Sequence, residues 1–423
     1  MLSFILRPFH TVREAAASIE GNSRIAFLEL FFTIPQAMYI GYMTLYMLEL
    51  GVTLTQVGII TSLGLGVQIF FVLISPFITD KLGRRHTTMI FDFVCWCVAL
   101  IIWAAAQNVY FFVVAAVVHA TMRIPAVSWQ CLMLEDSHPS VRVNIFNFVH
   151  LCSIIGGFFA PVGALLVNKL ELVPAMRIML AFCFICKLTH NTVRYFTTTE
   201  TEIGRQKMLE MKGVGLWASM RIYLPVLKRI VTNRGLIIAI SLRSLDFAQL
   251  TIRQTFLAVL VINRLGFPNE SMAVFQTVNA IVMLLVLLFI SPLLARFTRR
   301  WPISLGILFH LAATVVLLLS PSTQNYPLLI LSAILIALGT GIASPRINAL
   351  AANMVLNEDR SVANAIMGGL NLLLTLPFGY LGGILSGLDA RLPFLMTLII
   401  FLICLLMLHI AELSEKRKQA LNA

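Results

Sequence analysis

The sequence predicts an all-α membrane protein, with twelve transmembrane helices in two pseudo-symmetric six-helix bundles. Of its 423 residues, 59% are hydrophobic and only 12% are charged, whereas soluble domains carry about 25% charged residues. Twelve mostly apolar stretches each reach the roughly 20 residues that a helix needs to cross a bilayer. Short patterns in the first half of the chain recur in the second half. A chain this apolar requires the bilayer as its solvent.

The apolar stretches fall into two groups of six, separated by a polar stretch. The expected spans are 24–48, 54–78, 86–106, 109–134, 144–168 and 174–196, followed by 235–260, 269–295, 302–321, 326–352, 361–386 and 392–412. We therefore expect a first bundle over 1–196, a cytoplasmic linker over 197–234 and a second bundle with a cytoplasmic tail over 235–423. The N-terminal segment and the linker have basic, amphipathic sequences, which predicts that both lie on the membrane surface.

The distribution of basic residues predicts the orientation. With the N-terminus inside, the outer loops hold only four of the 31 Lys and Arg residues, namely Lys169, Arg177, Arg264 and Arg391. Cytoplasmic loops are enriched in these residues. We expect a multi-pass protein of the plasma membrane with both termini in the cytoplasm. The net charge of +12 then reflects topology and does not indicate nucleic-acid binding.

An internal repeat relates the two halves. Gly51 precedes Gly266 by 215 residues, and the Ser-Pro pair at 75–76 precedes the pair at 291–292 by 216. Pro125 precedes Pro345 by 220 residues, each within the fourth span of its half. The segment PSVRVN at 139–144 resembles RSVANA at 360–365. A repeat of this kind is typical of transporters built from two related bundles with a solute pathway between them.

The loop after the second span carries the most specific motif. It reads DKLGRR, and the residues that define it are Asp80, Lys81, Gly83, Arg84 and Arg85. This pattern resembles the signature loop of the major facilitator superfamily, although Pro76 occupies a position where members usually have glycine. The second-half copy keeps Arg296, Arg299 and Arg300 but lacks the aspartate and the glycine. The resemblance implies that the loop is a latch for one conformation. The alternative is that it only fixes the topology.

The fifth span contains the sequence GGFFAPVGA at 156–164. It is similar to the glycine- and proline-rich motif of drug/proton antiporters in the same superfamily, with alanine in place of some glycines. The resemblance implies export coupled to protons. Small residues also allow helices to pack closely, so plain packing remains the alternative.

Ionisable residues at membrane depth are costly and mark functional positions. The candidates are Glu29, Asp92, Arg123, Lys187, Arg243, Asp246, Arg253 and Arg346. For Asp92 a structural role is the alternative, and Lys187 and Arg346 can extend to the surface. Five of the eight are basic and three are acidic. This excess of positive charge favours a neutral or anionic organic substrate over a cationic drug.

The seventh span has the most informative pattern. Arg243, Asp246, Gln249 and Arg253 fall on one polar face, and Arg243 and Asp246 are close enough in sequence to form an ion pair. Glu29 precedes Asp246 by 217 residues, so each half offers a carboxylate at a corresponding place. We expect the proton-coupling and substrate residues to be Glu29, Arg123, Arg243, Asp246, Gln249 and Arg253. A static ion pair that fixes helix packing is the alternative.

The sequence therefore predicts a secondary transporter rather than an enzyme. It contains no HExxH, GxSxG or phosphate-binding GxxxxGK pattern. The cysteines lie within apolar stretches, so we expect neither a metal site nor any other cofactor. The expected partners are a small organic solute, protons and membrane lipids, and a monomer is expected. Proton-coupled export is the first hypothesis. Uptake of an anionic metabolite and a transporter-like sensor without flux are the alternatives.

Overall fold

The computed structural model describes residues 19–138, 141–221, 223–294, 301–321, 323–352 and 360–422. Within these ranges all regular elements are helical, and twelve helices are long and apolar enough to span a membrane. The predicted fold class is therefore confirmed, and the spans agree with prediction to within a few residues. The N-terminal amphipathic segment and the second-half loop copy with Arg296, Arg299 and Arg300 lie outside the described residues.

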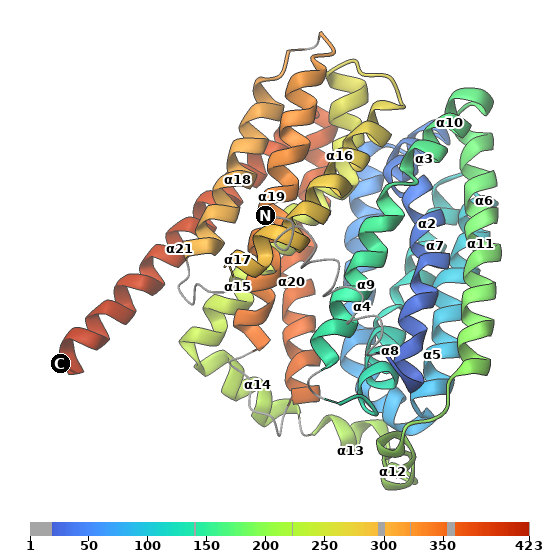
Figure 1. The fold of residues 1–423 in the computed structure, drawn as a ribbon, viewed down its shortest axis with the longest axis vertical. Helices are drawn as coiled ribbons and strands as arrows, with labels where there is room; N and C mark the ends of the chain where they lie inside the picture. Colours follow the sequence, from blue (N-terminus) through green and yellow to red (C-terminus); the bar gives the residue numbers. More distant parts are fainter. Residues whose placement is uncertain are drawn as a thin grey trace, which may run out of the picture. The chain divides into compact units, whose positions relative to one another are not determined.

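The first six spans are mostly built from shorter helical pieces (Figure 1). They comprise η1 (Gly21–Glu29), α2 (Leu30–Tyr39), η2 (Ile40–Tyr42) and α3 (Met43–Glu49); α4 (Leu54–Leu82); α5 (Arg84–Asp92), η3 (Phe93–Val98) and α6 (Ala99–Ala104); α7 (Val109–Ala120) and α8 (Arg123–Leu134); α9 (Arg142–Gly157) and α10 (Ala160–Leu170); and α11 (Leu172–Thr197).

The linker and the last six spans follow. The linker holds α12 (Glu202–Glu210), α13 (Leu216–Met220) and α14 (Tyr223–Thr232). The spans comprise α15 (Arg234–Ala258) with η5 (Val259–Arg264); α16 (Ser271–Leu285) with η6 (Val286–Ile290) and α17 (Ser291–Leu294); α18 (Trp301–Leu319); α19 (Tyr326–Ala352); α20 (Arg360–Leu388); and α21 (Leu392–Asn422).

Two prolines explain two of the breaks within spans. A proline lacks the backbone N–H and clashes with the carbonyl four residues earlier. Pro125 thus disrupts the helix at Thr121, which lies between the end of α7 and the start of α8. Pro161 disrupts it at Gly157, where α9 ends. Pro345, the counterpart of Pro125 in the repeat, lies inside the continuous helix α19.

The chain packs as two compact units. Unit 1 holds the residues up to Thr53 and Leu63–Leu224, and unit 2 holds Leu54–Ser62 and Pro225–Ala423. The first turns of α4 belong to unit 2, where a Cβ on Gly58 would lie 2.7 Å from the Gly383 Cα. Glycine at both positions lets the two backbones touch, and the Ser62 hydroxyl donates a hydrogen bond to the Leu376 carbonyl (2.8 Å). The repeat in the sequence did not predict this assignment.

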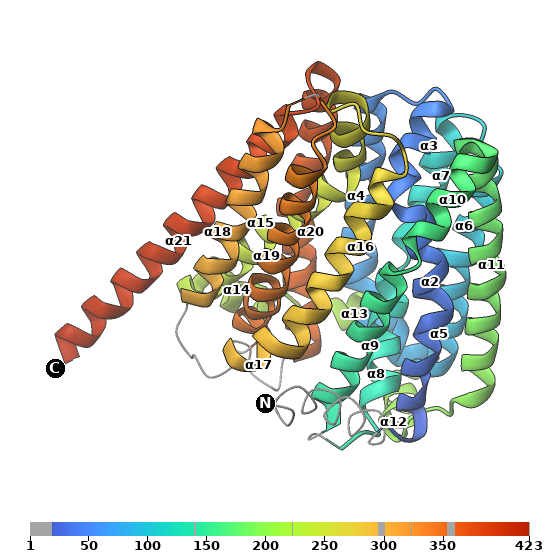
Figure 2. The same cartoon turned by 45° about the horizontal axis from the view of Figure 1, so that its top comes forward.

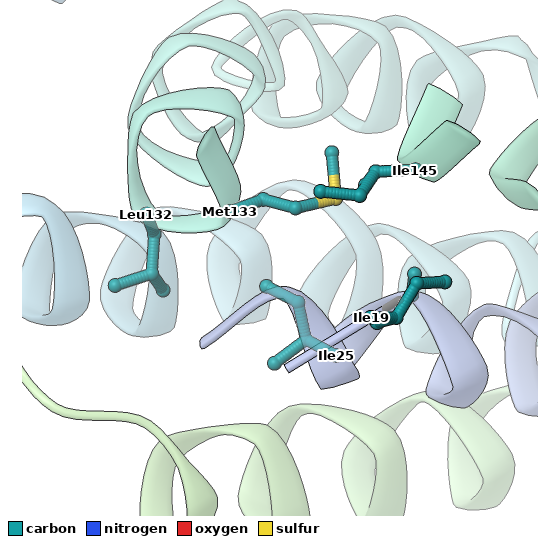
Figure 3. Packing of buried hydrophobic residues seen from close by; sticks show 6 residues of the cluster. Ile19, Ile25, Leu132, Met133 and Ile145 are labelled. Atoms are coloured by element: carbon teal, nitrogen blue, oxygen red, sulfur yellow. The ribbon is translucent and has the colours of Figure 1, made fainter. Parts of the chain in front are cut away.

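Apolar packing holds each unit together. In unit 1, Ile19 and side chains from η1, α8 and α9 form a buried cluster (Figure 3). Its members are Ile19, Ile25, Ala26, Leu132, Met133 and Ile145. In unit 2, α18 lies along α19 (Figures 1 and 2), and a Cβ on Gly306 would meet the Ala343 Cβ at 2.7 Å. Close packing of this kind stabilises membrane helices through dispersion contacts.

The backbone supports the internal repeat. Gly51 and Gly266 follow the first and seventh spans and adopt positive φ angles of 79° and 74°. Residues with a Cβ rarely adopt this conformation. Both halves therefore need glycine at the corresponding turn.

Candidate functional site

Unit 1 contains a buried group of five ionisable side chains, which we name the acid–base cluster: Glu29, Asp92, Lys187, His190 and Arg194. Asp92, on α5, accepts from two basic residues of α11, Lys187 and Arg194. The Lys187 Nζ lies 2.9 Å from the Asp92 Oδ2, and the Arg194 Nη2 contacts the same oxygen at short range. Residues 187 and 194 are two helical turns apart, so both project from one face of α11.

Neighbouring groups hold these bases in place. The Arg194 Nη2 donates to the Asn191 Oδ1 (2.7 Å), and the Asn191 Nδ2 donates to the Met89 carbonyl (3.0 Å). The Lys187 ammonium lies over the Phe32 ring, 4.2 Å from its centroid. Lys187 is only 3% exposed. It is thus a buried partner of Asp92. It does not extend to the surface, which was the alternative that the sequence left open.

Glu29, at the end of η1, meets the same cluster from another helix. Its Oε1 lies 3.7 Å from the His190 Nε2, which is too long for a hydrogen bond. The structure therefore brings Glu29 and Asp92 into one cluster, with Lys187 and Arg194 paired to the latter. Sequence reasoning missed His190 and Arg194. Their spacing with Lys187, three and seven residues along one helix, was the signal that could have found them.

Arg123, on α8, lies in the same unit but interacts elsewhere. Its Nε donates a 2.7 Å hydrogen bond to the Gln68 Oε1 on α4. A guanidinium bonded to an amide keeps its full charge, because the amide contributes only a dipole.

Unit 2 contains a polar seam between α15 and α19, formed by Asp246, Gln249, Arg253, Thr340 and Ser344. The Gln249 Nε2 donates to the Asp246 Oδ1 (3.2 Å), and the Arg253 Nη2 donates to the Thr340 Oγ1 (3.3 Å). Ser344 is a further hydrogen-bonding neighbour of Asp246. The polar face expected on the seventh span thus meets a second polar face on the tenth.

One prediction for this seam, an ion pair between two residues of α15, is wrong. Arg243 and Asp246 form no ion pair in the described part of the chain, although their spacing allows one. Asp246 instead takes its hydrogen bond from the amide of Gln249, one turn further along α15. Arg346, on α19, donates from Nη1 to the Ile342 carbonyl of its own helix (2.8 Å).

The signature loop is the centre of a second ionic network in unit 1. The Arg84 Nη1 lies 2.9 Å from the Asp80 Oδ1. The Arg84 Nε and Nη2 form a fork on the carboxylate of Glu135, at the end of α8, with distances of 3.1 and 3.0 Å. We name Asp80, Arg84, Arg85, Glu135 and Glu200 the loop network. A planar guanidinium fork gives such a pair both strength and direction.

Glu200 joins the loop to the start of the linker. Its Oε1 accepts from the Arg84 N–H (2.9 Å) and its Oε2 from the Arg85 N–H (3.0 Å). The carboxylate thereby caps the N-terminus of α5, where the helix dipole favours an anion. Gly83 has a φ of 83°, and a Cβ there would lie 2.6 Å from the Glu200 Oε2. Glycine at this position therefore provides both the turn and the space for the cap.

The remaining loop residues anchor to aromatic groups and backbone. The Arg85 Nη2 donates to the Tyr195 carbonyl (2.8 Å), and its guanidinium covers the Tyr195 ring at 4.2 Å. The Lys81 Nζ lies 5.2 Å from the centroid of the Phe77 ring. In the linker, the Tyr223 hydroxyl donates to the Leu73 carbonyl (2.9 Å). Burial and the nearby charge of Asp80 raise the pKa of Tyr223 to about 12, so this phenol remains a donor at neutral pH.

Glu135 and Glu200 were not found from the sequence. Each lies in a polar segment among other acidic residues, Glu135 beside Asp136 and Glu200 beside Glu202. Nothing in the local pattern distinguishes them. Only the fold brings the end of α8 and the start of the linker to the loop, beside α12 (Figures 1 and 2).

Twelve apolar spanning helices with ionisable side chains buried at membrane depth define a membrane transport protein. The sequence matches the family model described as Major Facilitator Superfamily over residues 25–275 and 244–422. The chain therefore belongs to the major facilitator superfamily, as its signature loop indicated. No functionally curated protein matches the sequence.

Solved structures share this fold. The nucleoside transporter NupG is 15% identical, with a TM-score of 0.66, and the alignment covers 92% of this chain and 97% of NupG. A peptide transporter POT in complex with sulfate is 14% identical, with a TM-score of 0.69 and coverage of 96% and 98%. A POT family transporter in complex with 5-aminolevulinic acid is 12% identical, with a TM-score of 0.69 and coverage of 93% and 95%. At this identity the likeness shows the fold alone.

Proposed function

We propose that the protein is a secondary active transporter that exports a small organic solute by alternating access and is driven by the proton gradient. The observation that carries the proposal is a contrast between buried carboxylates. Asp92 is neutralised by two bases, whereas Glu29 and Asp246 have no such partner within hydrogen-bond distance in the described residues. A carboxylate that is not neutralised at membrane depth gains the most from taking up a proton.

The positions of these two carboxylates support the proposal. Glu29 follows Gly21 by eight residues of 3₁₀ helix, which rises by about 2.0 Å per residue, or about 16 Å in all. Asp246 follows Arg234 by twelve residues of α-helix at about 1.5 Å each, or about 18 Å. Each carboxylate thus lies about as far from the start of its own span. Transporters of this architecture bind their substrates and coupling ions near the middle of the bilayer.

The test is transport in proteoliposomes, with and without a pH gradient. We expect Glu29→Gln and Asp246→Asn each to abolish gradient-driven transport, while exchange at equal pH survives in at least one of them. Asp389→Asn is the control, since this carboxylate is half exposed and lies 4.0 Å from the Arg264 Nε. Gradient-driven transport that is unchanged in both test variants would rule out the proton role.

The direction of transport rests on the resemblance of the fifth span to antiporters. Two of its glycines have a packing role: a Cβ on Gly156 would lie 2.6 Å from the Thr33 carbonyl oxygen, and one on Gly163 would lie 2.2 Å from that of Met38. Uptake of an anionic metabolite by symport is therefore the second candidate, favoured by the excess of arginine in unit 2. Flux measured in right-side-out and inverted vesicles distinguishes export from uptake. A protein that binds solute but gives no flux in either would be a sensor.

The proposal includes a plasma-membrane location with both termini in the cytoplasm, a monomeric protein and a loop network that acts as a conformational latch. The network supports the latch role because Arg84 bonds to two carboxylates from different segments, Asp80 and Glu135. A signal that only fixed topology would require the positive charges alone.

A further inference from the structure

The distribution of charge along the polar seam shows what kind of solute unit 2 suits. At membrane depth this unit carries the basic residues Arg243, Arg253 and Arg346 and the acidic residue Asp246. In unit 1, Asp92 is paired with Lys187 and Arg194, and Glu29 and Arg123 bring the corresponding groups to three basic and two acidic. The larger excess of positive charge therefore lies in the spans of unit 2.

None of the three arginines forms an ion pair in the described part of the chain. Arg253 donates to a neutral hydroxyl, that of Thr340, at the long distance of 3.3 Å. Arg346 donates to a carbonyl of its own helix. Arg243, which is partly buried, has no hydrogen bond or ion pair among the described residues. A desolvated guanidinium without an anionic partner is costly, which is why buried charges are normally paired.

The register of the seam relates the positions of these charges on α15 and α19. Asp246 neighbours Ser344, and Arg253 bonds to Thr340, so α15 and α19 run antiparallel. Continuing this register by one turn places Arg346 near the level of Arg243. Arg243 and Arg253 also project to the same side of α15 as Asp246, because all three belong to its polar face. Along α15, Arg243 and Arg253 lie ten residues apart, or about 15 Å, with Asp246 between them.

We infer that the seam of unit 2 binds the anionic group of the transported solute, a carboxylate or a phosphate, at Arg253, and that Arg243 adds attraction from further along the same helix. A guanidinium matches these groups with two parallel N–H donors. Thr340 adds a hydroxyl donor, and Gln249 adds amide hydrogens. This inference rests on the proposed transport function and names the substrate class for the same site.

The first experiment measures binding without transport. The melting temperature of the purified protein is followed with inorganic phosphate, phenyl phosphate and benzylammonium, against sodium chloride at the same ionic strength. We expect both phosphates to raise the melting temperature by at least about 2 °C near saturation, and benzylammonium to leave it unchanged. A shift with benzylammonium alone, or no shift with either phosphate, overturns the inference.

Variants then assign the binding to the seam. Arg253→Gln should lose most of the phosphate shift and Arg243→Gln a smaller part. Arg253→Lys should keep part of it, because lysine retains the charge without the fork. Arg264→Gln is the matched control, because this arginine lies at the end of the same span beside Asp389. Equal phosphate shifts in all of these proteins would mean that the anion binds elsewhere and would contradict the inference. Thr340→Val provides a test that keeps every charge, with a weaker phosphate shift expected.

A flux measurement separates this inference from the proposed function. Anion binding that depends on Arg253, without any flux driven by a pH gradient, would refute proton coupling and leave the anion site intact. Gradient-driven transport of a cation that is insensitive to Arg253→Gln would support proton coupling and refute the anion site.

Discussion

At the scale of single residues, the acid–base cluster contains one carboxylate that two bases hold. Asp92 lies between Lys187 and Arg194 and is nearly inaccessible to solvent. Removing its charge leaves two buried cations without their counterion. Breaking a buried pair in this way costs about 3–5 kcal/mol.

We therefore predict that Asp92→Asn lowers the stability of the protein by several kcal/mol, measured as the loss of folded protein during denaturation. Asp389→Asn should change it by less than about 1 kcal/mol, because that residue is half exposed and its ion pair is long. The double variant Asp92→Asn with Lys187→Met should recover part of the loss, since it removes one of the orphaned cations. Equal stabilities of Asp92→Asn and Asp389→Asn would show that the cluster is not a structural pair.

The loop network gives a second prediction at this scale. Asp80→Asn and Glu200→Gln keep the size of each side chain and remove its charge. We expect both to slow transport while leaving substrate affinity nearly normal, because these residues lie at the end of the spans and not at membrane depth. Accessibility of engineered cysteines to labelling should show a shifted population of inward- and outward-facing states. A collapse of affinity without a population shift would contradict the latch.

At the scale of elements, glycine decides how close α10 lies to α2. The carbonyl of Met38 lies where a Cβ on Gly163 would be, at 2.2 Å, whereas a Cβ on Gly64 would make an ordinary 3.8 Å contact with Ala116. We predict that Gly163→Ala reduces the yield of folded, transport-competent protein and that Gly64→Ala does not. Size-exclusion profiles and thermal stability would measure this. Tolerance of both alanines would mean that α2 can move away from α10 at little cost.

At the scale of the whole molecule, the charge bias predicts the topology. Reporter domains fused to either terminus should be active only if they function in the cytoplasm, because the outer loops carry four of the 31 Lys and Arg residues. A periplasmic or extracellular readout from either terminus would overturn the proposed orientation.

In a pump-deficient bacterial host, the substrate class should appear as resistance to toxic organic anions rather than to matched cations.

The sequence by itself determined the fold class, the twelve spans and the superfamily, and it predicted a carboxylate at a corresponding place in each repeat. These features depend on composition, length and local spacing, because a bilayer requires about 20 apolar residues per span and penalises every charge within it. Fixed spacing along one helix also predicted the polar face of the seventh span, which the seam on α15 matches.

Tertiary structure alone decided which charges neutralise one another. Asp92 precedes its partners Lys187 and Arg194 by about a hundred residues, and Glu200 reaches the signature loop from more than a hundred residues away. The spacing of Arg243 and Asp246 suggested an ion pair, yet Asp246 takes its hydrogen bond from Gln249. The spacing of residues along one helix indicates only which of its side chains can contact one another. The pairing itself depends on which helices pack together, because a buried charge is stabilised by whatever partner the neighbouring helix brings within reach.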